Sequence, residues 1–264
     1  MRSSILVLAS ALIGSVLGAE TPAPSVAPPQ VVILDCALNG SSTLGTQYIF
    51  RGLTQTDGKP TLQAELDLVH PSGFYVSAGL ANISWITDQF PVGPVSASVE
   101  VDVFGGYKWG FAKDWTLDVG LYRYLYPGTY TSLGAYNPNT TESYLGLSYS
   151  WASLKYSLVL SEDNFGIAKA KGSSYVDVSL GMPLGESGWT LLLHGGRTTF
   201  NTSSAAISQL LDYTDYKIGV AKEWKGYTAA LAATHADTKD LGYNNAMGRN
   251  IGKGRLTLTL TKIF

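Results

Sequence analysis

The stretch RLTLTLTKIF (Arg255–Phe264) alternates leucine with threonine in a strict period of two and closes the sequence on an aromatic residue. Successive side chains of a β-strand point to opposite faces, so the apolar face of this strand consists of Leu256, Leu258, Leu260 and Phe264. The opposite face carries Thr257, Thr259 and Thr261. Chain ends fray unless something ties them down, and we therefore expect this strand to be paired to its last residue. A closed barrel provides that pairing, because its last strand pairs with its first.

The same alternation runs through most of the chain, with the charged residues gathered on one side of each expected strand. Clear examples are TLQAELDLVH (61–70), SASVEVDVFGGYKW (96–109) and WTLDVGLY (115–122). A sheet that is apolar on one face and wet on the other gives this pattern. We predict that the polar face points inward and carries the acids Glu65, Asp67, Glu100, Asp102 and Asp118 and the bases Arg51, Lys108, Lys155, Lys217 and Arg255.

Short and long connections alternate between these strands. The short ones are HPSG (70–73), GFAKD (110–114), WAS (151–153), LGESG (184–188) and WKG (224–226), whereas stretches such as 127–141 and 239–254 are long. Outer-membrane barrels combine short periplasmic turns with longer extracellular loops. The sequence therefore predicts an all-β fold, a single antiparallel transmembrane β-barrel of about twelve strands with both termini in the periplasm. We expect its first hairpin to turn at TDGK (56–59).

The first thirty residues have a different character. Residues 1–19 combine Arg2, an apolar run and small residues before the expected cleavage site, which is typical of a signal peptide. Residues 20–30 form a proline-rich linker, and the barrel is expected over residues 31–264. Removal of Arg2 leaves 17 basic residues (18 minus one) against 20 acidic ones, a balance that argues against a nucleic-acid partner. The low charged fraction, 14% against about 25% in soluble domains, and the abundance of glycine and tyrosine fit a β-barrel.

Aromatic residues accompany the short turns. Outer-membrane barrels carry aromatic belts where the bilayer meets water, and the residues expected in such a girdle are Phe74, Trp109, Trp115, Trp151, Trp189, Trp224 and Tyr227. The alternative is that these are core aromatics of a soluble sandwich, which would have no reason to confine them to one end. A terminal phenylalanine after alternating apolar residues also resembles the signal by which the outer-membrane assembly machinery recognises its substrates. Phe264 is the expected assembly signal, and Lys262 departs from the pattern.

Candidates for catalysis and metal binding are few. His235 and Asp237 near a loop offer one acid–base pair, His194 is expected in the lumen, and His70 falls in a short turn. The sequence shows no nucleophile elbow, metal-ligand spacing or phosphate loop. Cys36 has no cysteine partner and is expected to be a small residue near the first strand. We therefore predict no catalytic residues, no metal and no cofactor.

Several blocks of the sequence resemble a known family. YIFRGLTQTDGKPTLQ (48–63), VEVDVFGGYKW (99–109) and LDVGLYRYLYPG (117–128) are similar to blocks of the TorF-type porin family of Gram-negative bacteria, also known as Gcw_chp. TESYLGLSYSWASLKYSL (141–158) and DYKIGV (215–220) extend the resemblance over most of the expected barrel. The resemblance implies an outer-membrane barrel and leaves the substrate open, because fold does not settle function.

These observations lead to one expected function and two alternatives. We expect a porin-like channel for passive passage of small hydrophilic solutes, located in outer-membrane lipid and inserted by the assembly machinery through its C-terminal strand. Most inward acids lie on the wall of the early strands, whereas Lys155, Lys217 and Arg255 lie on the wall of the later strands. Because the inward acids, counting Asp177, slightly outnumber the inward bases, we expect a conducting pore to prefer cations mildly. We predict that Arg51 contacts Glu65 or Glu100. The alternatives are a hydrolase at the extracellular rim, and a non-conducting structural or adhesion barrel whose inward charges only pair with one another.

Overall fold

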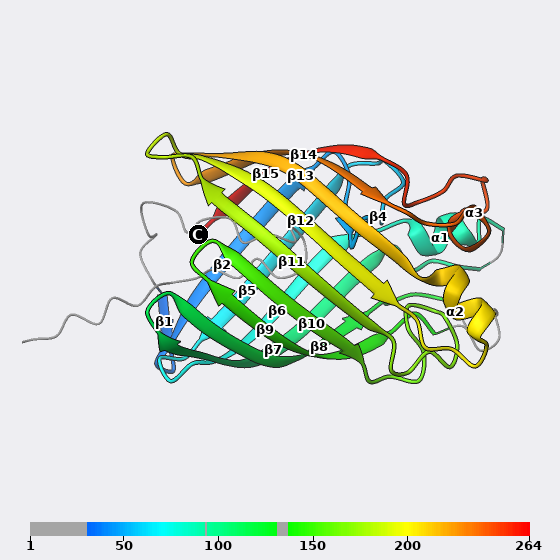
Figure 1. Cartoon of the computed structure of the whole chain (residues 1–264), viewed down its shortest axis with the longest axis horizontal. Helices are drawn as coiled ribbons and strands as arrows, with labels where there is room; N and C mark the ends of the chain where they lie inside the picture. Colours follow the sequence, from blue (N-terminus) through cyan, green and yellow to red (C-terminus); the bar gives the residue numbers. More distant parts are fainter. Residues whose placement is uncertain (1–30, 93, 131–136) are drawn as a thin grey trace, which may run out of the picture.

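The computed structural model describes residues 31–92, 94–130 and 137–264. Its main sheet has thirteen antiparallel strands, of which β1 (Val31–Ile33) is an appendage and the other twelve form a closed ring, because β2 pairs with both β15 and β5 (Figure 1). The strands of the ring are β2 (Cys36–Gly45), β5 (Thr61–Val69), β6 (Phe74–Asn82), β7 (Val99–Ala112), β8 (Trp115–Leu125), β9 (Thr140–Tyr149), β10 (Ala152–Val159), β11 (Ser174–Pro183), β12 (Trp189–Thr199), β13 (Tyr213–Trp224), β14 (Tyr227–Ala236) and β15 (Arg255–Ile263). The predicted all-β, twelve-stranded barrel is confirmed.

The seam of the barrel lies where β15 meets β2. Thr259 pairs with Gly45 and Ile263 with Ser41 along this seam, and Gly40 and Phe264 exchange backbone hydrogen bonds just beyond it. The same edge of β2 then pairs with β1, from Leu38 to Cys36. The final strand is thus paired to its last residue, as the alternation in Arg255–Phe264 predicts.

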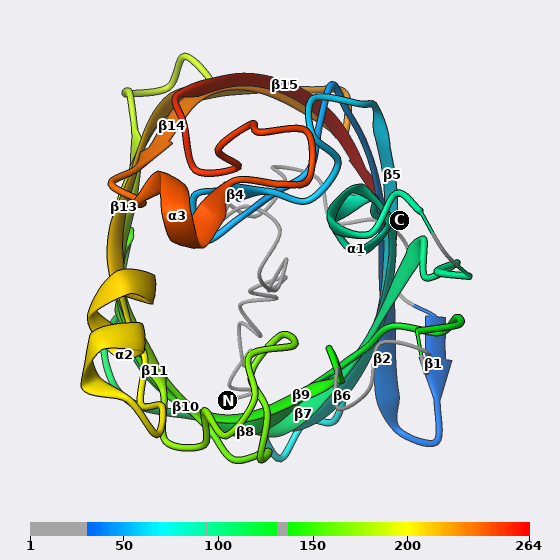
Figure 2. The same ribbon diagram turned by 90° about the vertical axis from the view of Figure 1, so that its right-hand side faces the viewer.

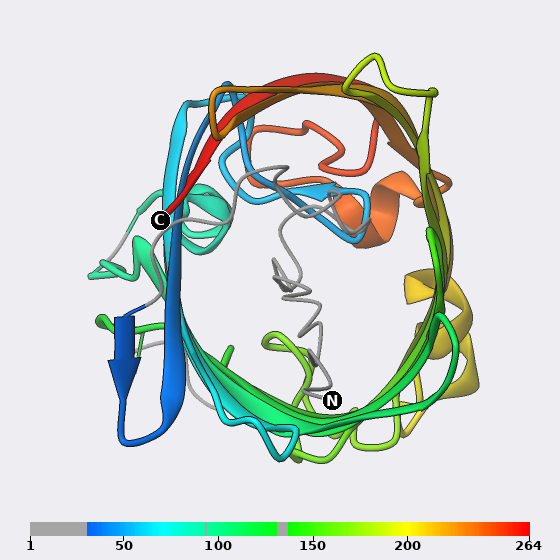
Figure 3. The same ribbon diagram turned by 90° about the vertical axis from the view of Figure 1, so that its left-hand side faces the viewer.

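The two ends of the barrel differ. One end, here called the short-turn end, carries the tight connections between strands, and Figure 3 faces it. The other, the long-loop end, carries the longer connections and the helices α1 (Trp85–Gln89), α2 (Ala205–Leu211) and α3 (Asp240–Tyr243). None of the helices in the described part of the chain could cross a bilayer. The expected signal peptide (1–19) and linker (20–30) lie outside the described residues.

Side chains alternate between the two faces of the ring. On β5, Thr61, Gln63 and Glu65 are buried on the inner side, whereas Leu62 and Leu66 are exposed on the outer side. On β15, Leu256, Leu258 and Leu260 are exposed, and Thr259 and Thr261 are buried. Because a one-residue slip would exchange these faces, the hydrophobic pattern fixes the register of the ring.

The connection from β2 to β5 folds into the ring instead of extending beyond it, and Figure 2 shows β4 inside the ring of strands. This connection, residues 46–60, is here called the inner loop. It contains the hairpin of β3 (Ile49–Phe50) and β4 (Leu53–Thr54), which turns at Arg51 and Gly52. Both turn residues have positive φ, +47° and +76°, as a tight two-residue hairpin turn requires. The prediction that the first barrel hairpin turns at TDGK is wrong, since β2 already ends at Gly45.

Backbone hydrogen bonds hold the inner loop in the barrel. The amide of Thr46 donates to Leu258 on β15 at 2.9 Å, and the amide of Thr54 donates to Ile251 at 2.9 Å. The carbonyl of Gln55 accepts bonds from Ser84 and Trp85, at the start of α1. The loop is therefore bonded to β15, to the connection that precedes β15 and to the start of α1.

Candidate solute pathway through the lumen

The inward acids of the early strands lie close together near the inner loop. Glu65 on β5 and Asp102 on β7 are separated only by Gly79 of β6, which pairs with both. In the next row toward the long-loop end, Glu100 accepts hydrogen bonds of 2.7 Å from the hydroxyls of Tyr48 and Tyr126. All three carboxylates are buried. The early wall thus gathers three buried carboxyl groups, one of which is bonded to a residue of the inner loop, Tyr48.

Tyrosines surround this acidic group. The rings of Phe104 and Tyr122 stack with centroids 4.6 Å apart, and those of Tyr122 and Tyr124 with centroids 4.2 Å apart. Burial, and next the charge of Glu100, raise the pKa of the Tyr48 phenol well above its ordinary value. Tyr48 therefore stays protonated and remains a hydrogen-bond donor to the carboxylate. A tyrosine hydroxyl can donate a hydrogen bond to a carboxylate of this wall without adding a positive charge.

A second inward group lies nearer the short-turn end. Asp67 on β5 accepts a hydrogen bond from Ser77, and Asp118 on β8 accepts one of 2.9 Å from the hydroxyl of Tyr75. The ammonium of Lys108 lies 4.8 Å from the centre of the Tyr75 ring. Lys108 therefore places a positive charge in this second group, whereas Glu100 of the first group is bonded by two tyrosine hydroxyls.

Arg51 points into the barrel, but its partner differs from the prediction. Its guanidinium forms a two-pronged ion pair with Glu142 on β9, through hydrogen bonds of 2.9 and 2.7 Å. Burial is the largest single influence and lowers the pKa of Arg51, but the charge and hydrogen bonds of Glu142 and the nearby tyrosines together raise it well above its ordinary value, so the group stays charged. The predicted contact with Glu65 or Glu100 is wrong, because the hairpin carries Arg51 away from the wall that bears those two acids.

The later strands carry both signs of charge. Lys155 on β10 lies with its ammonium 4.4 Å from the centre of the Tyr144 ring, and Lys217 on β13 also faces the lumen. Glu142, Asp177 and Asp215 face inward on the same part of the ring. The later wall is therefore mixed in charge, unlike the basic wall that the sequence predicts.

His194 is the centre of a buried network on this later wall. Its Nε2 lies 3.0 Å from Asp215 and 2.9 Å from the hydroxyl of Tyr175, and its Nδ1 lies 2.8 Å from Ser179. The expected lumenal position of His194 agrees with this geometry. The network joins β11, β12 and β13 on their inner side.

Arg255, the last of the predicted lumen residues, lies at the long-loop end. Its guanidinium is 3.6 Å from Asp57 of the inner loop, which also binds Arg249. Arg255 therefore fastens the inner loop to β15. This contact of Arg255 depends on the inner loop, whose position could not be predicted from the sequence.

Sequence reasoning missed Glu142, Tyr48 and Asp215. Glu142 alternates with Thr140 and Tyr144 on the inner face of β9. The same period-two alternation that indicates an inward position for Asp118 also indicates one for Glu142. The alternation along β13 indicates an inward position for Asp215 in the same way. Tyr48 belongs to the inner loop, and no periodicity marks its position. The ion pair of Arg51 with Glu142 joins residues 91 positions apart, and no local pattern could have indicated it.

The outward face carries the aromatic residues predicted for a girdle. Phe74, Trp115, Trp189 and Tyr227 begin strands at the short-turn end, and the remaining members, Trp109, Trp151 and Trp224, adjoin the same turns. All except the half-buried Trp115 are exposed. The ammonium of Lys262, the departure from the terminal pattern, lies 4.6 Å from the centre of the Tyr227 ring. A lysine so placed keeps its charge at the end of the barrel while its stem covers apolar surface.

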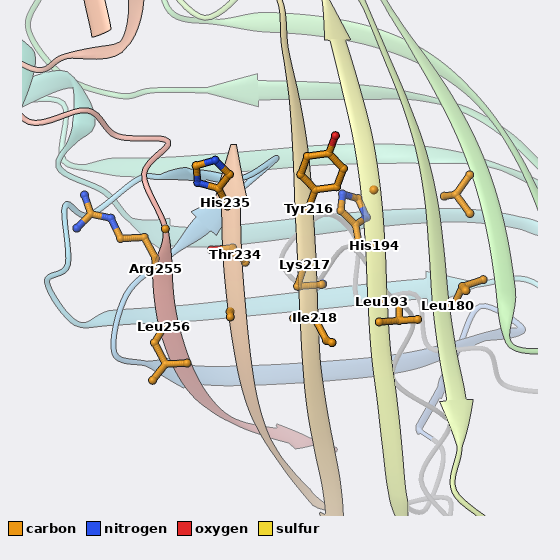
Figure 4. Close-up of a pocket in the computed structure, with 14 residues that line it drawn as sticks. Leu180, Leu193, His194, Tyr216, Lys217, Ile218, Thr234, His235, Arg255 and Leu256 are labelled. Carbon is orange, nitrogen blue, oxygen red and sulfur yellow. The ribbon is translucent and has the colours of Figure 1, made fainter. Parts of the chain in front are cut away.

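A groove of about 790 Å³ lies on the outward face of β11 to β15 (Figure 4). Its outward side chains are mostly apolar: Leu180, Leu193, Tyr216, Ile218, His235 and Leu256. His235 is exposed on β14, beside these leucines, whereas Asp237 accepts a hydrogen bond from the amide of Thr214. The structure therefore places His235 on the outer face of a strand and not in a loop.

The described residues offer no metal centre. Within 31–92, 94–130 and 137–264, no group of three His, Cys, Asp or Glu side chains is arranged to hold a metal ion. Cys36 is half-buried at the start of β2, and His70 bonds with Ser72 in a short turn.

Comparison with known proteins adds one match in sequence and several in fold. A family model described as "Bacterial protein of unknown function (Gcw_chp)" matches residues 36–264. No curated protein matches the chain. Among solved structures, the NanC porin is similar with a TM-score of 0.49 and 12% identity, over 86% of this chain and 98% of that one. OccAB3 of Acinetobacter baumannii gives a TM-score of 0.44 and 10% identity, over 88% of this chain and 65% of that one. A FadL homologue of Pseudomonas aeruginosa gives a TM-score of 0.42 and 15% identity, over 89% of this chain and 76% of that one.

Proposed function

This chain belongs to the Gcw_chp family, and we propose that it forms a porin-like channel for small hydrophilic solutes in the outer membrane of a Gram-negative bacterium. The observation that carries the proposal is the separation of faces around a closed ring. Exposed leucines, valines and aromatics cover the outside, and acids, lysines, threonines and tyrosines line the inside. A lipid environment requires such an apolar exterior and a ring without unpaired strand edges. The polar side chains of the interior can form hydrogen bonds with hydrophilic solutes.

In this proposal the short turns face the periplasm and the long loops face the outside. Outer-membrane barrels of even strand number have this arrangement. The aromatic girdle then lies at the periplasmic interface, and Phe264 presents the C-terminal strand to the assembly machinery. Protease added to intact cells should cut the connection at residues 201–204 and spare the turn at 184–188. Cutting only at residues 184–188 would contradict this orientation and would place the short turns outside the cell.

Transport is tested most simply by solute efflux from liposomes. Refolded protein should release a small neutral sugar from vesicles much faster than it releases a large dextran, because a pore that contains the inner loop passes only small molecules. A matched preparation that was heated and therefore unfolded serves as the control. If the sugar stays inside as long as in protein-free vesicles, the barrel does not conduct, and a structural role becomes the better description.

The groove around His235 favours no second function. A hydrolase at the rim would need His235 aligned with an acid and a nucleophile, and Asp237 is bound to the backbone of Thr214 instead. Neither the family description nor the similar structures indicate an enzyme directly.

A further inference from the structure

The ion pair of Arg51 and Glu142 has the composition of a recognition site for a guanidinium group. Glu142 lies on the wall strand β9 and receives two parallel hydrogen bonds. Tyr175, on the wall strand β11, places its ring 4.3 Å from the central carbon of the guanidinium. A carboxylate that binds in a two-pronged manner and an aromatic face are the partners that proteins use for guanidinium groups.

The two halves of this arrangement belong to different parts of the fold. Glu142 and Tyr175 come from the barrel wall, are nearly fully buried at 2% and 4% exposure, and are set by strand register. The guanidinium comes from the tip of the inner loop, next to the ring of Phe50 of the same hairpin. The wall thus presents a site, and the loop supplies its occupant.

The tip of the loop fits this place closely. Arg51 has a φ of +47°, in the left-handed region that residues other than glycine avoid. The neighbouring Gly52 lies against Asp215 and Ala236 on β13 and β14, where an added Cβ would collide with both side chains. The hairpin therefore reaches across the inside of the ring from the β2 side to strands β9 to β14, and its tip lies against their inner faces.

Glu142 needs a cation whenever the tip moves away. A buried carboxylate that loses its partner is strongly destabilised, and Lys155 on the adjacent strand β10 offers a point charge that cannot form the two-pronged pair. A solute that carries its own guanidinium would restore both the charge balance and the geometry. If such a solute replaces the Arg51 side chain, Glu142 keeps its two hydrogen bonds and Tyr175 keeps its contact with a guanidinium group.

We propose that Glu142 and Tyr175 form a guanidinium subsite on the solute path, which Arg51 occupies as an internal ligand and from which a guanidinium-bearing solute displaces it. This inference rests on the proposed channel function and names its substrate class. Because Arg51 is tethered, its effective concentration at the site is high. A free solute therefore binds the wild-type protein more weakly than it binds a variant without the arginine.

The test uses the refolded full chain in detergent and compares arginine with citrulline, which has the same length but an uncharged urea group. Arg51→Ala should bind arginine about tenfold or more tightly than citrulline, because hydrogen bonds to charged groups are worth more than neutral ones. Wild-type protein should bind arginine more weakly than Arg51→Ala. Arg51→Ala/Glu142→Gln should lose the preference, and Arg51→Ala/Tyr175→Leu should reduce it. Lys59→Ala, which removes an exposed cation of the same loop paired with Asp88, should behave as wild type.

A second readout covers the case in which Arg51→Ala folds poorly. Arginine should then raise the unfolding temperature of Arg51→Ala, and it should not do so for the double variant with Glu142→Gln. Equal binding of arginine and citrulline, or stabilisation that persists after Glu142→Gln, would overturn the subsite. Absence of ion conductance in both wild type and Arg51→Ala would overturn the proposed channel instead, and the two failures are therefore distinguishable.

Discussion

The ring of Phe264 lies directly over Gly40, on the outward face where β2 meets the end of the chain. The two residues exchange backbone hydrogen bonds of 2.8 and 2.9 Å, and a Cβ at position 40 would meet the edge of the phenyl ring. Gly40 therefore leaves the space on β2 in which the ring of the terminal phenylalanine packs. The alternation in Arg255–Phe264 brings the ring to this face, and the lack of a side chain at position 40 lets it settle.

Gly40→Leu should weaken closure of the barrel. The added side chain must displace the Phe264 ring, and overpacking of this kind costs about 1–3 kcal/mol. Gly195→Leu is the matched control, because Gly195 lies on another strand with no atom within 4 Å of an added Cβ. Urea unfolding in lipid vesicles measures both free energies of unfolding. Equal losses for the two variants would show that the Phe264 contact does not support the seam.

The outward face should reject charge. Val101→Lys should lower the free energy of unfolding by about 2–4 kcal/mol if the site lies near the bilayer midplane. Asp102→Lys, one residue along β7, should cost less, because it points inward and places its ammonium beside Glu65 and Glu100. Refolding titrations in vesicles compare the two. A larger loss for Asp102→Lys would show that the assignment of faces on β7 is wrong.

The pair of Arg51 and Glu142 should show strong coupling in a double-mutant cycle. Arg51→Met alone leaves a buried carboxylate without its partner, which costs about 3–5 kcal/mol. Arg51→Met together with Glu142→Leu should cost much less, because both charges are then removed. Unfolding by urea is the suitable measurement, since guanidinium chloride would itself compete for the site. Additive losses would mean that the two residues contribute independently.

The early acids should set the ion preference of the open channel. Carboxyl groups such as those of Glu100 and Asp102 favour cations when they are ionised, as acidic rings do in pores. Wild-type protein should therefore show a mild cation preference in the reversal potential under a KCl gradient, and Glu100→Gln/Asp102→Asn should reduce it. The preference should also fall as salt rises, because the screening length drops from about 10 Å at 0.1 M to about 3 Å at 1 M. An anion-selective wild type would exclude the early acids from the mechanism.

The barrel could be predicted from the sequence because its strands obey one rule. Period-two alternation indicated the strands, and with them the inward positions of residues such as Glu65 and Lys155. The inner loop did not follow from that rule, because YIFRGL (48–53) reads as a continuation of the first strand and its fold depends on the left-handed turn at Arg51 and Gly52. The partners of Arg51 are set by the diameter and register of the closed ring, which no local stretch of sequence encodes.

Single-channel recording on refolded wild type and Arg51→Ala, with Lys59→Ala as control, shows whether the barrel conducts and whether the tip of the inner loop narrows its lumen. We expect discrete conductance steps in all three proteins, with larger steps for Arg51→Ala, because the inner loop no longer holds its tip against Glu142. Steps of the same size in Arg51→Ala and wild type would show that the loop tip does not narrow the path. Silence in all three proteins, with folding verified by their β-sheet circular dichroism, would contradict the channel itself.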